Sequence, residues 1–347
     1  MIESTNNFFS KKTPSIFIIN SPLHVLCVME AINEFSLEDY SIIFLTKKNE
    51  IRNSQTISML NYFNLKYKRF DLCFAFNFLS FIRLFLGNSK KYSRVFVPCG
   101  LGAMVYIVCL NYLKKAGHLV YIDDGIATIA ILKDEKRSFV NKRAYIMYKL
   151  VKYIFKTKKI EIDKYFYTLY SDISTLKIVY PNSFTNLSKC LGEKQIHSND
   201  IYFIGTVVDR VCKLNSIPLD LFKEILGNLM DDAIKQNPDK KVFYIPHGRD
   251  RSSFIVDFCR LHNVEYHPLD EAIELYFVKN HIRPLSVYGY VSTALLNIKK
   301  IMPDVNVINW YLASKKSVLY ENRHNVSVYY ATHGIEYRFF DVDKLKS

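Results

Sequence analysis

The chain has 347 residues, of which 49% are hydrophobic and 23% are charged, so it can bury a sizeable core and is not a wholly disordered polypeptide. Lys and Arg total 47 against 33 Asp and Glu, and the net charge of +14 favours anionic partners without choosing among nucleic acid, anionic lipid and phosphorylated or acidic small molecules. No apolar run approaches the ~20 residues of a membrane-spanning helix, and the N-terminal sequence lacks the layout of a signal peptide.

The first half of the chain alternates short β-rich runs with amphipathic stretches. We expect strands at 15–20, 40–46, 66–72, 94–98 and 118–122. Helices are expected at 21–35, at 51–64, and after a glycine turn near residue 100, running to residue 117.

The second half repeats this pattern. Its expected strands are 200–208, 240–248, 264–268, 285–290 and 305–311. Its expected helices are 219–236, 254–263, 271–280 and a helix that begins at 292.

This alternation predicts an α/β protein built from parallel βαβ units with helices on both faces of the sheets. The length suggests two domains. The simplest architecture is two Rossmann-like domains facing a central cleft, residues 1–192 and 193–347, with the polar connection 180–199 as the hinge. In such sheets, ligands bind beyond the carboxyl ends of the strands.

A basic segment at residues 136–159 carries nine Lys and Arg residues and no acidic residue. Aromatic and aliphatic residues are interleaved among the basic ones. A basic amphipathic helix of this kind can lie on an anionic membrane surface. The alternative is a helix packed on a sheet with a cationic solvent face, and the sequence leaves both open.

The cysteines are scattered and form no C-x-x-C pair. They are Cys27, Cys73, Cys99, Cys109, Cys190, Cys212 and Cys259. Their odd number and spacing suit neither a disulfide framework nor a zinc site, so the cytoplasm is the expected compartment.

Four polar clusters fall where an expected strand gives way to a loop or helix. They are Ser21-Pro22-Leu23-His24, Asp123-Asp124-Gly125, Pro246-His247-Gly248-Arg249 and Ser292-Thr293. Glu274 lies in the short helix between the last two. Polar groups at the carboxyl edges of several strands are expected to converge on one cleft.

Each cluster also has an ordinary structural explanation. Asp-Asp-Gly is a common turn, although a carboxylate at a cleft can act as a general base toward a hydroxyl. Ser292 can simply cap a helix, or with Thr293 it can use the same geometry to bind an anion.

The remaining candidates divide in the same way. His247 is either a loop residue or a donor to a phosphate that Arg249 also holds. Glu274 is either an exposed helix residue or an acceptor of hydrogen bonds from ribose hydroxyls.

Metal and nucleotide-triphosphate sites find no support in the sequence. Asp123 and Asp124 lack D-x-D spacing, and there is no H-x-x-x-H or Cys/His cluster, so we expect no metal and no cofactor. The absence of G-x-x-x-x-G-K-[ST] excludes a P-loop NTPase.

Together these clusters resemble the bacterial sialyltransferases of the GT-B kind, especially the lipooligosaccharide sialyltransferases of glycosyltransferase family 52 and the capsule polysialyltransferases. Those families carry an acidic-acidic-Gly motif, a His-Pro motif and a Ser-Ser or Ser-Thr motif in that order. The matches here are "DDG" at Asp123, "PHGRD" around His247 and "ST" at Ser292, and "SPLHVLCVMEAI" looks like the opening strand-to-helix turn. Gly248 stands at the usual proline, whereas a literal His267-Pro268 occurs one strand later, so His267 is the alternative to His247.

The resemblance implies an inverting, metal-independent transferase that uses CMP-sialic acid. Residues 1–192 would form the acceptor-binding domain, with Asp123 as the general base and Asp124 orienting it. Residues 193–347 would bind the CMP-sugar. There His247 would assist the departing phosphate. Removing Asp123 or His247 is expected to cost about 10²–10⁴-fold in rate.

The resemblance assigns substrate binding to the remaining positions. These are Asp124, Gly125, Arg249, Glu274, Ser292, Thr293, Ser21 and His24. The acceptor would be galactose or sialic acid in a surface glycan such as O-antigen, lipooligosaccharide or capsule. It would be lipid-linked, at the inner face of the cytoplasmic membrane.

Three other hypotheses remain open from the sequence. One is a glycosyltransferase of the same kind that uses another nucleotide sugar. The second is a non-catalytic basic protein that binds nucleic acid, which we do not favour because no nucleic-acid-binding module is recognisable. The third is a scaffold on a membrane surface.

Overall fold

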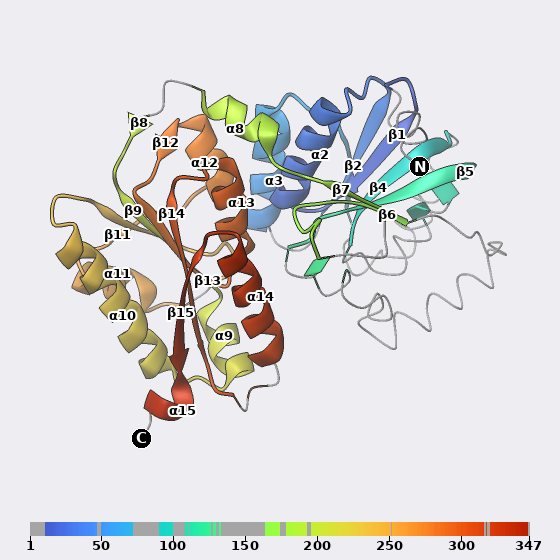
Figure 1. Ribbon diagram of the computed structural model, residues 1–347. Helices are drawn as coiled ribbons and strands as arrows, with labels where there is room; N and C mark the ends of the chain where they lie inside the picture. Colours follow the sequence, from blue (N-terminus) through green and yellow to red (C-terminus); the bar gives the residue numbers. More distant parts are fainter. Residues whose placement is uncertain are drawn as a thin grey trace. The chain divides into compact units, whose positions relative to one another are not determined.

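The computed structural model describes residues 11–46, 50–71, 90–99, 108–109, 111–125, 128–129, 132, 164–173, 178–192, 196–250, 252–315, 317 and 320–345. The chain divides into two compact units, Met1–Asn186 and Leu187–Ser347, and each is described by itself (Figure 1). The expected domain boundary at 192/193 lies a few residues later, just after α8 (Thr185–Leu191). The basic segment 136–159 lies outside the described residues.

Unit 1 is built on a seven-stranded parallel sheet with the strand order β3-β2-β1-β4-β5-β6-β7. The strands are β1 (Ser15–Ile19), β2 (Tyr40–Thr46), β3 (Lys68–Asp71), β4 (Tyr92–Pro98), β5 (Leu113–Ile122), β6 (Lys164–Thr168) and β7 (Ile178–Pro181). The central strands are almost continuously apolar because helices cover a parallel sheet on both faces. In β1, all five residues are buried.

Helices α2 (Pro22–Glu34) and α3 (Glu50–Tyr62) connect the first three strands of this sheet and lie side by side (Figure 1). The opposite face has its own core, in which Ile16 and Ile18 of β1 pack with Ile43 and Leu45 of β2. Alternate residues of one strand therefore serve two cores, as the two-residue period of a strand requires.

Strand β5 begins earlier than the sequence suggested. We expected residues 113–117 to end a helix, but they belong to β5, and the pairing with β4 shifts register between Tyr92 and Arg94. Gly117 fits this irregular stretch because a Cβ there would stand 2.8 Å from a Leu113 side-chain carbon. The long-range pairing with β4 therefore overrides the local helical pattern.

The polar connection 180–199 is not a simple loop, because it contains helix α8. The Glu30 carboxylate of α2 accepts hydrogen bonds from the backbone N–H (3.1 Å) and the side-chain amide (2.9 Å) of Asn186. These bonds satisfy a donor in the first turn of α8 from a distant part of the sequence, which no local pattern can reveal.

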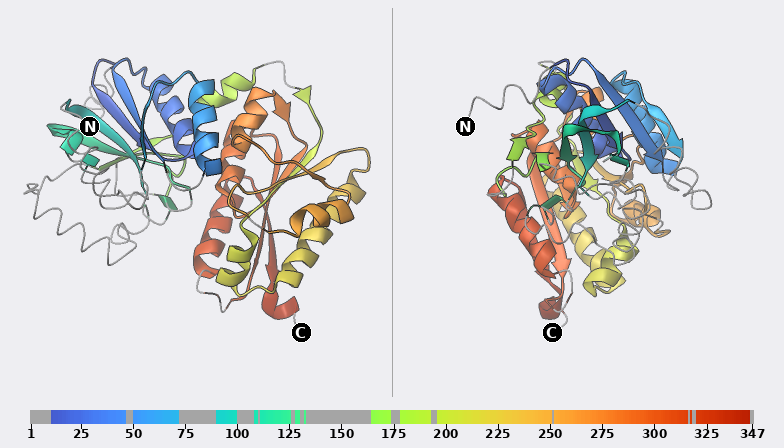
Figure 2. Two further views of the ribbon diagram at one scale, coloured as in Figure 1. Left: turned by 180° about the vertical axis from the view of Figure 1, so that it is seen from behind. Right: turned by 90° about the vertical axis from the view of Figure 1, so that its right-hand side faces the viewer.

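Unit 2 is built on a six-stranded parallel sheet with the strand order β11-β10-β9-β13-β14-β15. The strands are β9 (Ile201–Ile204), β10 (Val242–Ile245), β11 (Glu265–Tyr266), β13 (Ser286–Tyr290), β14 (Asn306–Ala313) and β15 (Glu336–Asp341), and a separate pair is formed by β8 (Ile196–His197) and β12 (Ile282–Arg283). The helices are α9 (Val208–Asn215), α10 (Leu219–Gln236), α11 (Ile255–Leu261), α12 (Ile273–Lys279), α13 (Thr293–Ile301), α14 (Tyr320–Thr332) and α15 (Val342–Leu345). Helices α10 and α11 lie on one face of the sheet, and α13 and α14 lie on the other (Figures 1 and 2).

Both sheets follow the doubly wound order, in which the chain moves outward from the first strand and then returns to its other side. The order reverses between β1 and β4 in unit 1 and between β9 and β13 in unit 2. Ligands of such sheets bind at these points, outside the carboxyl ends of the strands. The prediction of two Rossmann-like domains is confirmed.

Candidate active site

The polar clusters of unit 1 lie at the carboxyl ends of its strands. Ser21 and His24 follow β1, Asp123 and Asp124 follow β5, and Thr168 ends β6. Because all these strands run parallel, their ends meet at one edge of the sheet, and the side chains come within reach of one another.

Asp123 is completely buried. Its Oδ1 accepts a hydrogen bond from the hydroxyl of Thr168, and its Oδ2 accepts one from the backbone N–H of Leu169 at 2.9 Å. Burial raises the pKa of Asp123 to about 7, against the lowering effect of the bonds from Thr168, Leu169 and Thr128. This proton affinity suits a general base, but both oxygens face the end of the neighbouring strand.

Asp124 is the partly exposed member of the pair, with 29% of its side chain accessible. Its Oδ1 lies 3.1 Å from Nε2 of His24, which is fully buried. The sequence assigned substrate contact to His24, whereas in the structure the imidazole reaches Asp124. The carboxylate that meets solvent is therefore the second one of the motif.

The turn after β5 explains the glycine of the motif. Gly125 has φ +68°, a conformation that favours glycine, and its carbonyl accepts a hydrogen bond from the Thr128 N–H at 3.0 Å. The Thr128 hydroxyl in turn accepts the Asp124 backbone N–H at 2.9 Å. Gly125 thus shapes the turn that carries Asp124, and substrate contact by Gly125 stays a prediction.

Ser21 is the N-cap residue of α2 and is buried. Its carbonyl accepts the backbone N–H of His24 at 3.1 Å, and Pro22 occupies the first helical position, where its missing N–H costs nothing. The Ser-Pro-Leu-His sequence therefore starts the helix directly at the end of β1, which brings His24 to the sheet edge.

In unit 2, His247 lies in the loop after β10. The backbone N–H of Arg249 donates to His247 Nδ1 at 3.0 Å, so Nδ1 is an acceptor and the proton of the neutral ring is on Nε2. Asp250 anchors the loop, since its Oδ1 accepts from the Val208 N–H at 3.3 Å and from the Ser252 hydroxyl at 2.8 Å. Partial burial, and then the neighbouring Arg210, lower the pKa of Arg249.

The strand order separates the two histidine candidates. His247 follows β10, which is separated from β13 by one intervening strand, whereas His267 follows β11, which is separated from β13 by two. At about 4.8 Å per strand, their strand axes lie roughly 10 Å and roughly 14 Å from β13. His267 also packs between the rings of Phe243 and Tyr276, at centroid distances of 5.5 and 5.6 Å. The arrangement favours His247 as the partner of the Ser292 cluster.

Ser292 is the N-cap of α13, and its hydroxyl accepts the Ala294 backbone N–H at 3.3 Å. The preceding residue, Val291, has φ +43°, which is rare for a β-branched residue. Such outliers cost on the order of 1–3 kcal/mol and concentrate at functional sites. The turn starts α13 at the carboxyl end of β13, a strand that borders the switch point of the sheet.

Glu274 is buried in the first turn of α12. Its Oε1 accepts a 2.6 Å hydrogen bond from the side-chain amide of Asn297 on α13. Burial raises the pKa of Glu274, and the bond from Asn297 opposes this rise. The structure thus ties Glu274 to the helix that Ser292 begins, and contact with ribose stays a prediction.

Comparisons of the structure with solved structures give long but distant matches. A galactoside α-2,3-sialyltransferase from the marine bacterium Photobacterium phosphoreum has a TM-score of 0.52 at 12% identity, covering 94% of this chain and 99% of its own. The GT-B domain of a sialyltransferase from Photobacterium damselae has a TM-score of 0.51 at 13% identity, covering 94% and 100%. The fold is GT-B.

An enzyme of another class also has a similar fold. A UDP-N-acetylglucosamine 2-epimerase has a TM-score of 0.51 at 10% identity, covering 97% of this chain and 86% of its own. No protein-family model and no curated protein matches the sequence. Identities this low establish the GT-B fold alone and leave the reaction to the residues.

Several residues that support these clusters in the two units carried no signal in the sequence. Thr168 and Asn297 hold Asp123 and Glu274, and Asn309 holds the turn at Val291. Single Thr and Asn residues in apolar runs have no motif of their own. Only the position of Thr168 at a strand end resembled the pattern of the four clusters.

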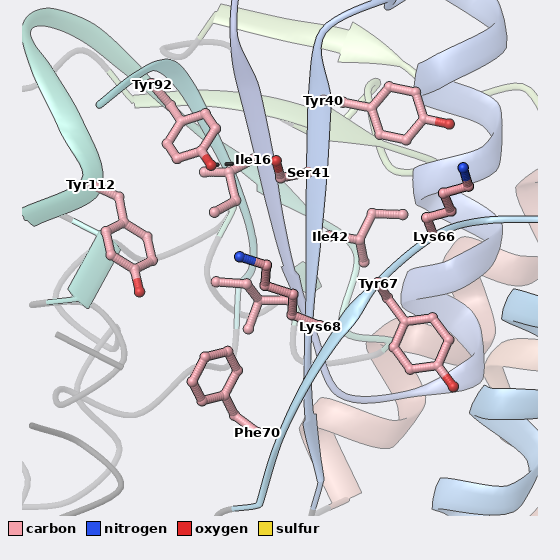
Figure 3. A pocket seen from close by; sticks show the side chains of 11 residues that line it. Ile16, Tyr40, Ser41, Ile42, Lys66, Tyr67, Lys68, Phe70, Tyr92 and Tyr112 are labelled. Carbon is pink, nitrogen blue, oxygen red and sulfur yellow. Dashed lines mark hydrogen bonds between the residues drawn. The ribbon is translucent and has the colours of Figure 1, made fainter. Parts of the chain in front are cut away.

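A separate pocket of about 340 Å³ lies in unit 1 (Figure 3). Its lining includes Tyr40, Tyr67, Tyr92, Lys66 and Lys68, from the amino ends of the strands and the segment before β3. None of the predicted site residues lines it, so it is distinct from the carboxyl-end cluster.

The part of the chain that the structure describes holds neither a metal-ligand cluster nor a membrane-spanning helix. Within it, no group of three metal-ligating side chains lies together, and metal independence stays a prediction. No helix in the same residues is long and apolar enough to cross a membrane.

Proposed function

We propose that this protein is an inverting glycosyltransferase that moves sialic acid from CMP-sialic acid to a hydroxyl of galactose or sialic acid in a bacterial surface glycan. The observation that supports this proposal is the position of the three motifs on the strands. The DDG, PHGR and ST motifs follow β5, β10 and β13, each at a carboxyl end, in a fold that two sialyltransferases share over 94% of this chain.

The reaction assigns the acceptor proton to a carboxylate. An acceptor hydroxyl attacks the anomeric carbon, a new C–O bond forms, the bond from that carbon to the phosphate oxygen breaks, and CMP departs. Asp124 takes the hydroxyl proton in this proposal because its carboxylate is partly exposed. Asp123 as the base remains a prediction, which its complete burial does not favour.

In this proposal, residues of unit 2 bind the phosphate of the departing CMP. His247 donates a hydrogen bond from its Nε2–H to the phosphate, because Nδ1 already accepts the Arg249 N–H. Ser292, Thr293 and the positive end of the α13 dipole bind the same anion. The Arg249 guanidinium adds positive charge, and Glu274 accepts hydrogen bonds from the ribose.

The test is a donor panel. The purified protein is incubated with CMP-sialic acid or UDP-sugars, with galactosides and sialosides as acceptors, with and without EDTA. Transfer from CMP-sialic acid in the presence of EDTA is expected. UDP-sugars are included because a UDP-N-acetylglucosamine 2-epimerase has a similar fold. Transfer from a UDP-sugar and not from CMP-sialic acid would show that the proposed donor is wrong.

Two outcomes would overturn the proposal. No turnover with any donor, together with steeply salt-dependent DNA binding, would indicate a nucleic-acid-binding protein. Loss of transfer on metal removal would contradict a metal-independent mechanism. Binding to anionic vesicles tests the proposed association with a membrane surface separately.

A further inference from the structure

His24 has both ring nitrogens occupied by different parts of unit 1. Nδ1 accepts the backbone N–H of Asn20 at 3.1 Å, and Nε2 lies 3.1 Å from Asp124 Oδ1. The side chain has no accessible surface. A buried imidazole with two directed partners has one orientation, because any rotation of the ring would leave a buried polar group unpaired.

The partners also fix the proton. A backbone N–H can only donate, so Nδ1 of His24 presents its lone pair to Asn20. The proton of the neutral ring therefore sits on Nε2 and points at the Asp124 carboxylate. A hydrogen bond to a charged acceptor is stronger than one between neutral groups.

The Asn20 end of this relay is held as well. Arg52 of α3 donates from Nη2 to the side-chain oxygen of Asn20 at 3.2 Å, and Asn20 itself is buried. The relay thus starts at α3, passes through the turn after β1, and ends at the turn after β5. His24 and Asp124 are 100 residues apart in sequence, and β4 lies between their strands in the sheet.

We propose that His24 is a positioning residue for the base. Its Nε2–H holds one oxygen of Asp124, which keeps the carboxylate in a single orientation toward the acceptor hydroxyl. This inference rests on the proposed function, since it assigns His24 a part in the same reaction. It replaces substrate contact as the role of His24.

Two near-isosteric variants separate the two halves of the relay. H24Q retains a donor at the place of Nε2 and loses the acceptor for Asn20, whereas H24N retains the acceptor and loses the donor to Asp124. If positioning of Asp124 matters, H24Q is expected to exceed H24N in kcat by about tenfold or more, with KM for CMP-sialic acid within about twofold in both. Equal activity of the two variants would overturn the proposal.

A double-mutant cycle tests whether His24 acts through Asp124. The H24N/D124N enzyme is expected to be no slower than D124N, because the interaction that H24N removes no longer exists. Additive losses would mean that His24 acts elsewhere. The melting temperatures of H24N and H24Q are compared in parallel, since a structural effect alone would follow stability rather than the identity of the retained group.

A third measurement does not depend on the variants folding or on turnover. Nitrogen-15 NMR of the full chain with labelled histidine reports which ring nitrogen carries the proton, and the His24 signal is expected to show protonated Nε2 and unprotonated Nδ1. The reverse tautomer would overturn the inference even if transfer is observed. Absence of transfer by the wild type would instead overturn the proposed function.

Discussion

Asn309 on β14 accepts the backbone N–H of Val291 at 2.9 Å, and this bond holds the turn at φ +43°. The Asn309 amide donates onward to the Ser327 hydroxyl of α14 at 3.0 Å, so the turn is braced by a buried polar network. The strained residue stands directly before the Ser292 cap of α13. The proposed phosphate site is thus built on a conformation that the neighbouring strand imposes.

This strain predicts that at Val291 a glycine variant is at least as stable as an alanine variant, the reverse of the usual order. A left-handed conformation costs an L-residue about 1–2 kcal/mol, which glycine does not incur. V291G is therefore expected to melt at or above the temperature of V291A. At Val287, which is buried inside β13, V287G is expected to be less stable than V287A by about 0.5–1 kcal/mol. The same order at both positions would show that Val291 is unstrained.

The buried Asp123 predicts a pH-dependent stability. Its folded pKa of about 7 is raised above an unfolded value of about 3.9, so the folded state binds the extra proton between these values. The stability from this group is complete below about pH 4 and is lost as pH rises toward 7, by about 1.4 kcal/mol for each unit. The free energy of urea unfolding, measured from pH 5 to 8, should fall in the wild type relative to D123N until about pH 7. Above that pH the curves of the two proteins should run parallel. Parallel curves throughout would contradict the raised pKa.

The two aspartates of the motif predict different kinetic effects. D124N is expected to lower kcat for sialic acid transfer by about 10²–10⁴-fold, the usual cost of removing a general base. D123N, in which an amide can keep one of the two acceptor contacts, is expected to lose less than tenfold at equal folded fraction. A larger loss in D123N than in D124N would return the base to Asp123.

The two histidines of unit 2 that are candidates for the His-Pro role, His247 and His267, form a matched pair for mutagenesis. H247A is expected to cost about 10²–10⁴-fold in kcat with CMP-sialic acid, because it removes the Nε2 donor beside the phosphate site. H267A is expected to stay within tenfold, since His267 follows the edge strand β11 and packs against Phe243 and Tyr276. The opposite ranking would move the His-Pro role of the family to His267.

Glu274 predicts a separation of stability from donor affinity. E274Q keeps an acceptor for the Asn297 amide and is expected to fold like the wild type, whereas E274A leaves that amide unpaired at about 1–3 kcal/mol. If the carboxylate binds ribose hydroxyls, E274Q still raises KM for CMP-sialic acid about tenfold or more. An unchanged KM in E274Q would limit Glu274 to a structural role, and CMP titration by calorimetry gives the same answer independently.

The alternation of strands and helices could be predicted from the sequence because it depends on the local periodicity of apolar residues. Apolar runs such as the one at β1 predict strands of a parallel sheet, and Ser21-Pro22 predicts the start of α2. The same rules failed at residues 113–117, where pairing with β4 overrides the local pattern. They also missed α8, whose first turn is capped by Glu30 from another part of the chain.

Local sequence patterns were enough to predict a two-domain α/β protein with polar clusters at strand ends, because side-chain period and turn chemistry are properties of neighbouring residues. The three-dimensional fold was needed to show that Asp123 is buried against the end of β6 while Asp124 contacts His24, and that Asn297 and Asn309 support the polar cluster of unit 2. These contacts depend on strand order, which is set by packing between residues far apart in the sequence. Burial and hydrogen-bond partners at strand ends follow from that order, and they cannot be read from the local motif.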